Sequence, residues 1–136
     1  MKYFTIAELT RSETAQRKGI VNEPDGMERA ALERLVDNVL DPIRQAWGKP
    51  ILVNSGFRCR ELNAAVGGVA TSQHLKGEAA DIRDASGDNK GLFELIKDMG
   101  RKGLINFDQL IDESNLTWIH VSYRPHGNNR NQILKL

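Results

Sequence analysis

The sequence is poor in the residues that build disulfide frameworks and membrane spans. Cys59 is the only cysteine among 136 residues, so no intrachain disulfide can form and a disulfide-framed secreted module is excluded. No window approaches the roughly 18 consecutive apolar residues of a membrane-spanning helix. The first residues also lack a charged segment followed by an apolar one. We therefore expect a protein made in the cytoplasm without a signal peptide and without a transmembrane segment.

Neither sign of charge is in excess. Lysine and arginine number 19 against 18 aspartates and glutamates, for a formal net charge of +1, and the basic residues are scattered along the chain. This balance gives no electrostatic footprint for nucleic acid, so we expect no nucleic-acid partner. A chain of 136 residues with 40% hydrophobic content fits one domain, residues 1–136, and we expect a monomer.

The hydrophobic pattern predicts an α+β domain. Apolar residues recur every three or four positions between Met27 and Trp47, which indicates the longest helix, and Pro42 within it predicts a kink or a break. The segments 107–113 and 117–123 alternate as strands joined by a short turn, so they should pair antiparallel. Further helices are expected at 5–18, 60–66 and 89–102, and further strands at 51–55, 78–83 and 132–136. Because strands and helices are partly segregated, we expect a small antiparallel sheet with helices packed on it.

The stretch from Ser72 to Asp81 carries two candidate metal ligands. Gly77 can adopt the positive φ of a tight turn, which lets the loop that carries His74 fold back against an extended run from 78 to 83. Side chains alternate along such a run. Asp81 can therefore point back toward His74.

His120 supplies a second imidazole from the segment Trp118-Ile119-His120-Val121. Two imidazoles and one carboxylate suit zinc, and a catalytic zinc ion usually has three protein ligands and one position for water or substrate. His74, Asp81 and His120 are therefore the candidate ligands of one Zn²⁺ ion, although their spacing alone does not settle the assignment. For either histidine alone, the alternative is an ordinary hydrogen-bonded packing residue near a strand end.

These segments resemble a known family. The string S-x-H-x-x-G-x-A-x-D, read with S-G-F-R at 55–58 and W-I-H-V at 118–121, is similar to the D-Ala-D-Ala carboxypeptidase-like zinc peptidases of the M15 group, especially its short phage and bacterial members. The resemblance runs from the region of Phe4 through Tyr123. It implies the M15 zinc peptidase fold, of the hedgehog and DD-peptidase type, and it assigns the zinc to the same three residues.

The resemblance also gives roles to Arg58 and Ser72. The family's S-G-[FY]-R arginine contacts substrate and stabilises the transition state, and Arg58 matches it by position. Ser72 matches a serine that contacts bound substrate. The alternatives are a surface arginine at a strand end and a loop serine that only orients the His74 loop.

The general base is the least defined part of the predicted site. In several M15 subfamilies an acidic residue lies three positions before the last histidine, where this chain has Thr117, which cannot act as a base. The short members often carry Q-L-I-x-E, which matches 109–113. Strand parity places Glu113 on the face that antiparallel pairing can bring beside His120, and Asp112 on the opposite face. Glu113 is therefore the predicted base, with Asp112 as the alternative.

Three further side chains have structural interpretations. Cys59 has no neighbouring base in the sequence and is interpreted as a semi-buried structural thiol. His126 lies in a turn-rich stretch and is interpreted as an exposed loop histidine. Trp118 is interpreted as a wall of the metal pocket or a core residue.

The resemblance implies hydrolysis of a peptide bond in the stem peptides of bacterial peptidoglycan, with the endolysin-like cell wall degradation of the short phage members. Such a protein would reach the wall only after release across the membrane. Two alternatives stay open: a carboxypeptidase that trims small soluble peptides, and a zinc-containing binding protein without turnover. The bond that is cut, L-Ala-D-Glu, D-Ala-D-Ala or a crosslink, is not readable from the sequence.

Overall fold

The computed structural model describes residues 1–136. Its centre is a five-stranded sheet in the order β1-β2-β4-β3-β5. The strands are β1 (Ile51–Ser55), β2 (Ala79–Asp84), β3 (Gln109–Glu113), β4 (Trp118–Ser122) and β5 (Gln132–Lys135). Neighbouring strands run antiparallel except β3 and β5, which are parallel. The predicted α+β class with a small, mainly antiparallel sheet is confirmed, and the parallel last strand is the one departure from it.

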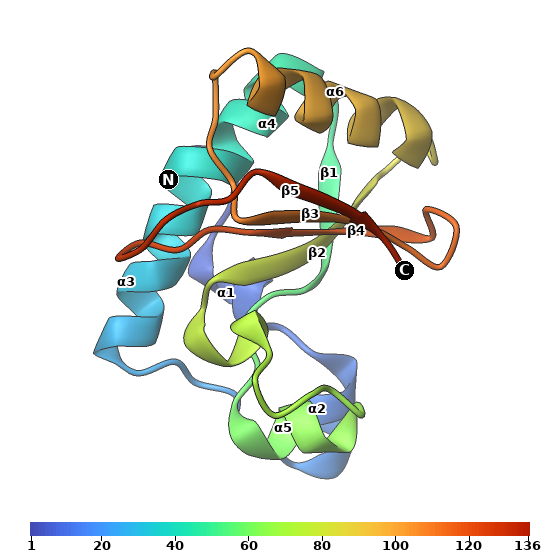
Figure 1. Ribbon diagram of the computed structural model, residues 1–136. Helices are drawn as coiled ribbons and strands as arrows, with labels where there is room; N and C mark the ends of the chain where they lie inside the picture. The colour runs from blue at the N-terminus through green and yellow to red at the C-terminus, as the bar shows by residue number, and fades with distance from the viewer.

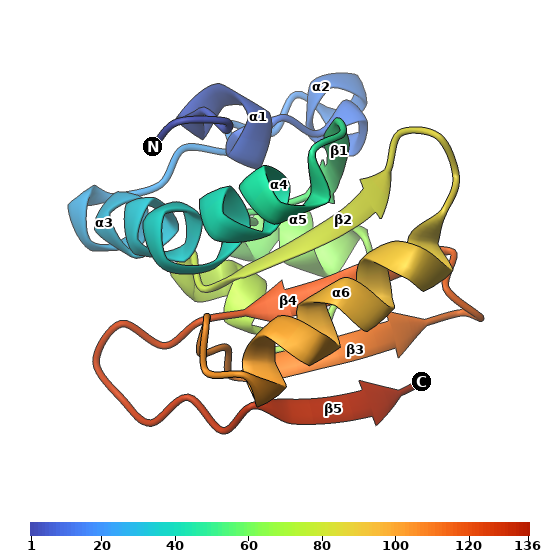
Figure 2. The ribbon, with the colours of Figure 1, turned by 90° about the horizontal axis from the view of Figure 1, so that it is seen from above.

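Helices lie on both sides of this sheet, but the hydrophobic core lies on one side. There α6 (Asn89–Arg101) packs on β2, β3 and β4, whereas α5 (Arg60–Ala65) lies on the opposite side (Figures 1 and 2). Ile82 of β2 and Ile119 of β4 are fully buried in the core. Because side chains alternate along a strand, the residues next to them point to the other, more polar face.

The longest helical segment runs without interruption from Gly26 to Trp47. It consists of α3 (Gly26–Leu35), a π-helical turn η1 (Val36–Leu40) and α4 (Asp41–Trp47). Pro42 lies in the first turn of α4, directly after the π turn, whose end is marked by a hydrogen bond from the Asp41 N–H to the Val36 carbonyl. The wider turn accommodates a residue that has no N–H, so the helix changes its hydrogen-bond pattern instead of ending.

Two expectations about the helices are wrong. The segment 5–18 forms two short helices, α1 (Ile6–Thr10) and α2 (Glu13–Lys18), because Ser12 accepts a hydrogen bond from the Ala15 N–H and starts a new helix. Met27 does not join the apolar face of α3, since it is 80% exposed. The other predicted elements are present, with bounds that differ by at most two residues. None of the helices has both the length and the apolar character needed to cross a bilayer.

An unusual turn joins β3 to β4. Ser114, Asn115 and Leu116 all have a left-handed backbone, with φ of 50°, 55° and 59°. This conformation costs a non-glycine residue about 1 kcal/mol. Asp112 offsets part of the cost, because its Oδ1 accepts a hydrogen bond from the Leu116 N–H at 2.7 Å. The turn fixes the strand register that places Glu113 at the end of β3, opposite Trp118.

Candidate metal centre

The three predicted ligands converge on the polar face of the sheet. Asp81 of β2 and His120 of β4 are paired across the strands, and His74 reaches them from the short 3-10 helix η2 (Gln73–Lys76). One donor atom of each residue lies within 4.8 Å of the other two. Oδ1 of Asp81 is 3.0 Å from Nδ1 of His120, and Oδ2 is 3.3 Å from Nε2 of His74. The prediction that Asp81 points back toward His74 is confirmed.

Residues at the two ends of η2 determine the conformation of the loop that carries His74. Ser72 accepts a hydrogen bond from the His74 N–H at 3.2 Å and so caps the start of η2. Gly77 ends it with a left-handed φ of 73°, and a Cβ at this position would collide with the carbonyl oxygen of Glu28. The predicted turn at Gly77 is confirmed. Ser72 has the orienting position of a loop serine and also lines the groove over the three ligands.

The backbone of the loop after β1 fixes the tautomer of His74. Nδ1 of His74 lies 2.6 Å from the carbonyl oxygen of Gly56 and donates to it, because a carbonyl oxygen can only accept. Nε2, which faces Asp81, then carries the lone pair that can ligate a metal ion. Only glycine fits at position 56, since a Cβ there would collide with the backbone of Leu9. No pattern in the sequence predicts that the Gly56 carbonyl binds His74.

Arg58 borders the three ligands. Its Nη2 lies 3.7 Å from Oδ2 of Asp81, and its side chain is 14% exposed, so it is not the surface arginine that was the alternative. Nε donates to Oγ of Ser55 at 3.2 Å, and Nη1 donates to Oδ1 of Asn63 at 3.0 Å. Ser55 and Asn63 therefore hold the guanidinium in place. Sequence reasoning missed both, although a polar residue such as Asn63 on the buried side of a short helix is a usable signal.

The centre places charges of opposite sign in a buried setting. Burial alone would raise the pKa of the Asp81 carboxyl, but its hydrogen bonds with His120 and His74 outweigh burial and hold the pKa below its ordinary value. Burial lowers the pKa of Arg58, and the charge of Asp81 opposes that shift. Arginine nevertheless stays protonated in proteins. Asp81 is thus a carboxylate, and Arg58 a cation, at neutral pH.

A groove of about 570 Å³ opens over the three ligands. Glu113 and Trp118 line it from the ends of β3 and β4. The predicted parity of β3 is therefore confirmed for Glu113, and the interpretation of Trp118 as a pocket wall is confirmed as well. Asp112 lies outside this lining and uses its carboxylate in the β3–β4 turn. Of the two candidate bases, Glu113 is the one that faces the groove.

The remaining histidine and the cysteine lie away from the centre. His126 is exposed in the loop after β4 and lines a different hollow, together with residues of α3. Cys59 is half-buried and free. Both interpretations made from the sequence agree with these positions.

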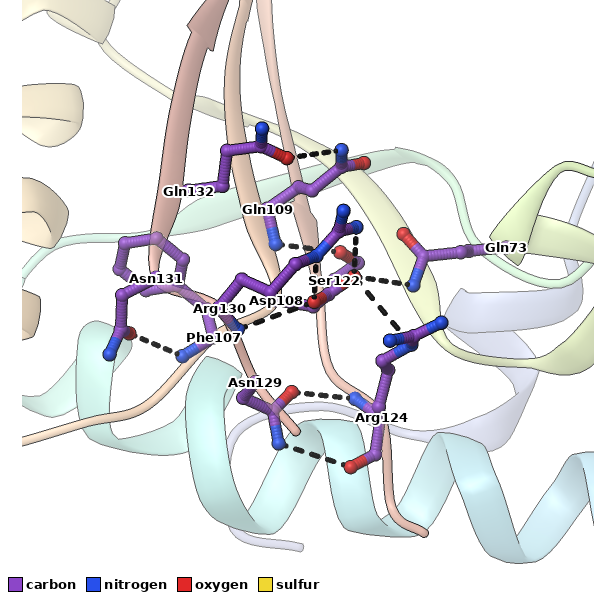
Figure 3. Close-up of polar contacts among 10 residues, drawn as sticks. All are labelled: Gln73, Phe107, Asp108, Gln109, Ser122, Arg124, Asn129, Arg130, Asn131 and Gln132. Atoms are coloured by element: carbon purple, nitrogen blue, oxygen red, sulfur yellow. Dashed lines mark hydrogen bonds and ion pairs between the residues drawn. The ribbon is translucent and has the colours of Figure 1, made fainter. Parts of the chain in front are cut away.

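A second polar cluster holds η2 against the sheet (Figure 3). Asp108, fully buried just before β3, accepts two hydrogen bonds from the guanidinium of Arg130, both at 2.9 Å. Its Oδ2 also accepts a hydrogen bond from Nε2 of Gln73 at 3.1 Å. The hydrogen bonds from Arg130 are the main reason that the pKa of Asp108 lies below its ordinary value. Because Gln73 precedes His74, this cluster ties the metal loop to β3 and to the segment before β5.

We expect Asp108→Asn to destabilise the fold by about 2 kcal/mol, because the substitution removes a buried carboxylate that accepts charge-assisted hydrogen bonds. The measurement is the free energy of unfolding in urea. Asp98→Asn is the matched control: Asp98 is half-exposed on α6, where it pairs with Lys102 at 2.9 Å. The control should shift stability by no more than about 0.5 kcal/mol. Equal effects of the two substitutions would contradict the structural role of Asp108.

The donor atoms of the centre suit zinc. Nε2 of His74, Nδ1 of His120 and a carboxylate oxygen of Asp81 are ligand types that zinc takes at catalytic sites. The Gly56 carbonyl that holds the other nitrogen of His74 is the kind of outer partner that ligating histidines usually have. The three residues could therefore hold a metal ion.

An α+β domain that presents such ligands in an open groove, with an arginine and a glutamate beside them, has the construction of a metal-dependent hydrolase. The sequence comparisons identify the family. The chain belongs to the family described as Peptidase M15, whose sequence model matches residues 2–122. The resemblance seen in the sequence motifs is confirmed by this match.

A curated relative adds a more specific likeness. The zinc D-Ala-D-Ala carboxypeptidase of Streptomyces albus G is 39% identical to this chain over 80 residues. The match covers 58% of this chain and 30% of the relative. The chain therefore spans less than a third of the length of the curated relative that it matches.

Proposed function

We propose that this protein is a zinc metallopeptidase that hydrolyses a peptide bond in the stem peptides of bacterial peptidoglycan. The observation that carries the proposal is the position of Asp81 between His74 and His120, beside Arg58 and in one groove with Glu113. Membership of the M15 peptidases supports peptide hydrolysis. The name of the Streptomyces relative supports both zinc and a D-Ala-D-Ala type of substrate.

The three ligands and the metal ion would make different contributions to hydrolysis. A zinc ion held by His74, Asp81 and His120 would supply Lewis-acid activation of the scissile carbonyl and of a water molecule near neutral pH. His74 keeps its Nε2 available because Gly56 binds its Nδ1. Asp81 brings one negative charge, and because Asp81 is buried this charge needs a cation as its partner.

Two more side chains serve the substrate. Arg58 offers N–H donors to the carbonyl oxygen as negative charge develops there, and donors that are held in place before the reaction stabilise such charge most effectively. Glu113 takes the proton of the attacking water on its carboxylate and passes it to the leaving amine nitrogen. Trp118 walls the groove beside Glu113.

We expect Arg58→Lys to lower kcat by about tenfold or more while the zinc content stays at the wild-type level. Lysine keeps the charge but loses the planar set of donors that reaches Asp81, Ser55 and Asn63 together. Steady-state kinetics and metal analysis of the same preparation measure the two quantities. An unchanged kcat/KM would remove Arg58 from the catalytic role.

Purified peptidoglycan sacculi test the proposed function directly. Incubation with the zinc-loaded protein should release new amines, and the products should identify the bond. Free D-Ala indicates a carboxypeptidase, while larger fragments indicate an endopeptidase. Turnover of small soluble peptides without any action on sacculi would favour the trimming carboxypeptidase. Zinc binding without release from either substrate would favour a binding protein.

A lytic role is the finer part of the proposal. The likeness of the motifs to short phage and bacterial M15 members supports an endolysin-like enzyme that degrades the cell wall. The protein should then lower the turbidity of a suspension of cells whose outer membrane has been permeabilised. Chelator-treated protein is the control, and equal clearing by both preparations would discard this role.

A further inference from the structure

A second pocket lies beside the metal centre, on the other side of Arg58. It has a volume of about 490 Å³, and Arg58 lines both this pocket and the groove over the metal ligands. Nη2 of Arg58 faces Asp81, whereas its Nε donates to Ser55, which lines the second pocket. The two hollows thus share one guanidinium. A peptide that lies over the metal ligands can reach the second pocket by passing this side chain.

The second pocket carries a positive charge. Arg11 and Arg83 line it together with Arg58, against one carboxylate, that of Glu13. The arginines that form ion pairs in this structure do not include Arg11 or Arg83. The guanidinium of Arg83 makes one hydrogen bond, from Nε to Oδ1 of Asn54 at 2.9 Å. Its two terminal nitrogens are therefore available to an external ligand.

Neither Arg11 nor Arg83 forms an ion pair or packs in the core. Arg83 lies two residues beyond Asp81 in β2, so it shares the polar face with that metal ligand. Arg11 lies in the extended link between α1 and α2 and has no side-chain hydrogen bond. Both side chains are exposed and contribute no packing to the core. An anion bound between them would supply the partner that the protein does not.

We propose that this arginine pocket, formed by Arg11, Arg58 and Arg83, binds a carboxylate of the peptide substrate close to the bond that is cut. The proposal rests on the proposed function. Guanidinium groups match a planar carboxylate through parallel N–H donors, and the hydroxyls of Ser12 and Ser55 in the lining can donate as well. A stem peptide offers two such groups, the C-terminal carboxylate and the α-carboxylate of its γ-linked D-glutamate.

Three matched peptides identify the carboxylate. They are a stem pentapeptide with both carboxylates free, the same peptide with a C-terminal amide, and the same peptide with the D-glutamate α-carboxylate amidated. Wild-type enzyme should show a raised KM for one amidated peptide. In the double variant R11Q/R83Q the preference for the free carboxylate should fall by about tenfold, because charge-assisted hydrogen bonds to it are lost.

The control variant removes the same charge elsewhere. R29Q/R101Q takes one arginine from the exposed side of α3 and one from the end of α6, and neither residue lines the arginine pocket. It should keep the wild-type preference among the three peptides. A preference that R11Q/R83Q retains, or loses only as much as the control does, overturns the proposal.

Failure of the proposed function is seen separately. If wild-type enzyme cleaves neither these peptides nor purified sacculi, the proposed function fails, and calorimetric binding of the same peptides decides the role of the pocket. Tighter binding of the peptide with free carboxylates by wild type than by R11Q/R83Q then supports the pocket. If wild type and R11Q/R83Q bind the free and the amidated peptides equally well, the proposed carboxylate pocket is discarded.

Discussion

Replacing His74 by alanine is expected to remove the metal ion and to abolish hydrolysis. His74 is almost fully buried, and its Nε2 faces Asp81 because its Nδ1 is bound to the Gly56 carbonyl. No neighbouring side chain can replace that nitrogen donor. Loss of an outer partner of a metal ligand costs roughly 10- to 100-fold in metal affinity, and loss of the ligand itself should cost more. Activity should fall below detection.

Metal analysis after dialysis measures this effect, with about one zinc ion per chain expected for the wild type and little for the variant. The same depletion by a chelator should abolish wild-type hydrolysis and lower the melting temperature, since a ligand that binds only the folded state stabilises it. Added zinc should restore both. His126→Ala, at an exposed loop position, is the control and should keep its metal. Equal zinc content in His74→Ala and wild type would refute the assignment.

Replacing Glu113 by glutamine is expected to reduce turnover on the order of a hundredfold, the lower range for loss of a general acid or base. Glutamine has nearly the same shape, so the strand pairing with Trp118 and the lining of the groove should persist. Only the ability to accept a proton is removed. Zinc content and the free energy of unfolding should therefore match those of the wild type, while kcat falls.

Asp112→Asn separates the two acidic candidates. Its oxygen can still accept the Leu116 N–H, so the β3–β4 turn should survive and turnover should stay close to the wild-type value. The reverse pattern, with turnover lost in Asp112→Asn and kept in Glu113→Gln, would make Asp112 the base. If neither substitution matters, the proton is carried by a group other than these two.

Local chain geometry accounts for the parts of the site that the sequence predicts. A left-handed glycine reverses the chain wherever the neighbouring residues allow it, so Gly77 could be assigned to the turn that returns Asp81 to His74. Alternation is a property of any strand, which is why Asp81, His120 and Glu113 could each be assigned to one face of its own strand. Both patterns depend only on residues that are close together in the sequence, so the sequence alone is enough to read them.

Contacts between distant segments are the part that could not be predicted. The Gly56 carbonyl binds His74 across 18 residues of sequence, and Asp108 binds Gln73 across 35. Single polar side chains of this kind carry no periodic pattern, so their partners appear only once the backbone is in place. The parallel direction of β5 also depends on the path of residues 123–131, and alternation within a strand contains no information about direction.

The pairing of Asp81 with His120 also governs when the centre can form as the chain folds. His74 and Asp81 lie on one short loop and strand, and a short loop closes at small entropic cost. His120 is 39 residues from Asp81, so it arrives only after the intervening chain has been ordered and β4 has paired with β2. A slip of one residue would direct Ile119 or Val121 to the polar face instead. Binding of one metal ion by all three residues would therefore require that the central strands have reached the native register.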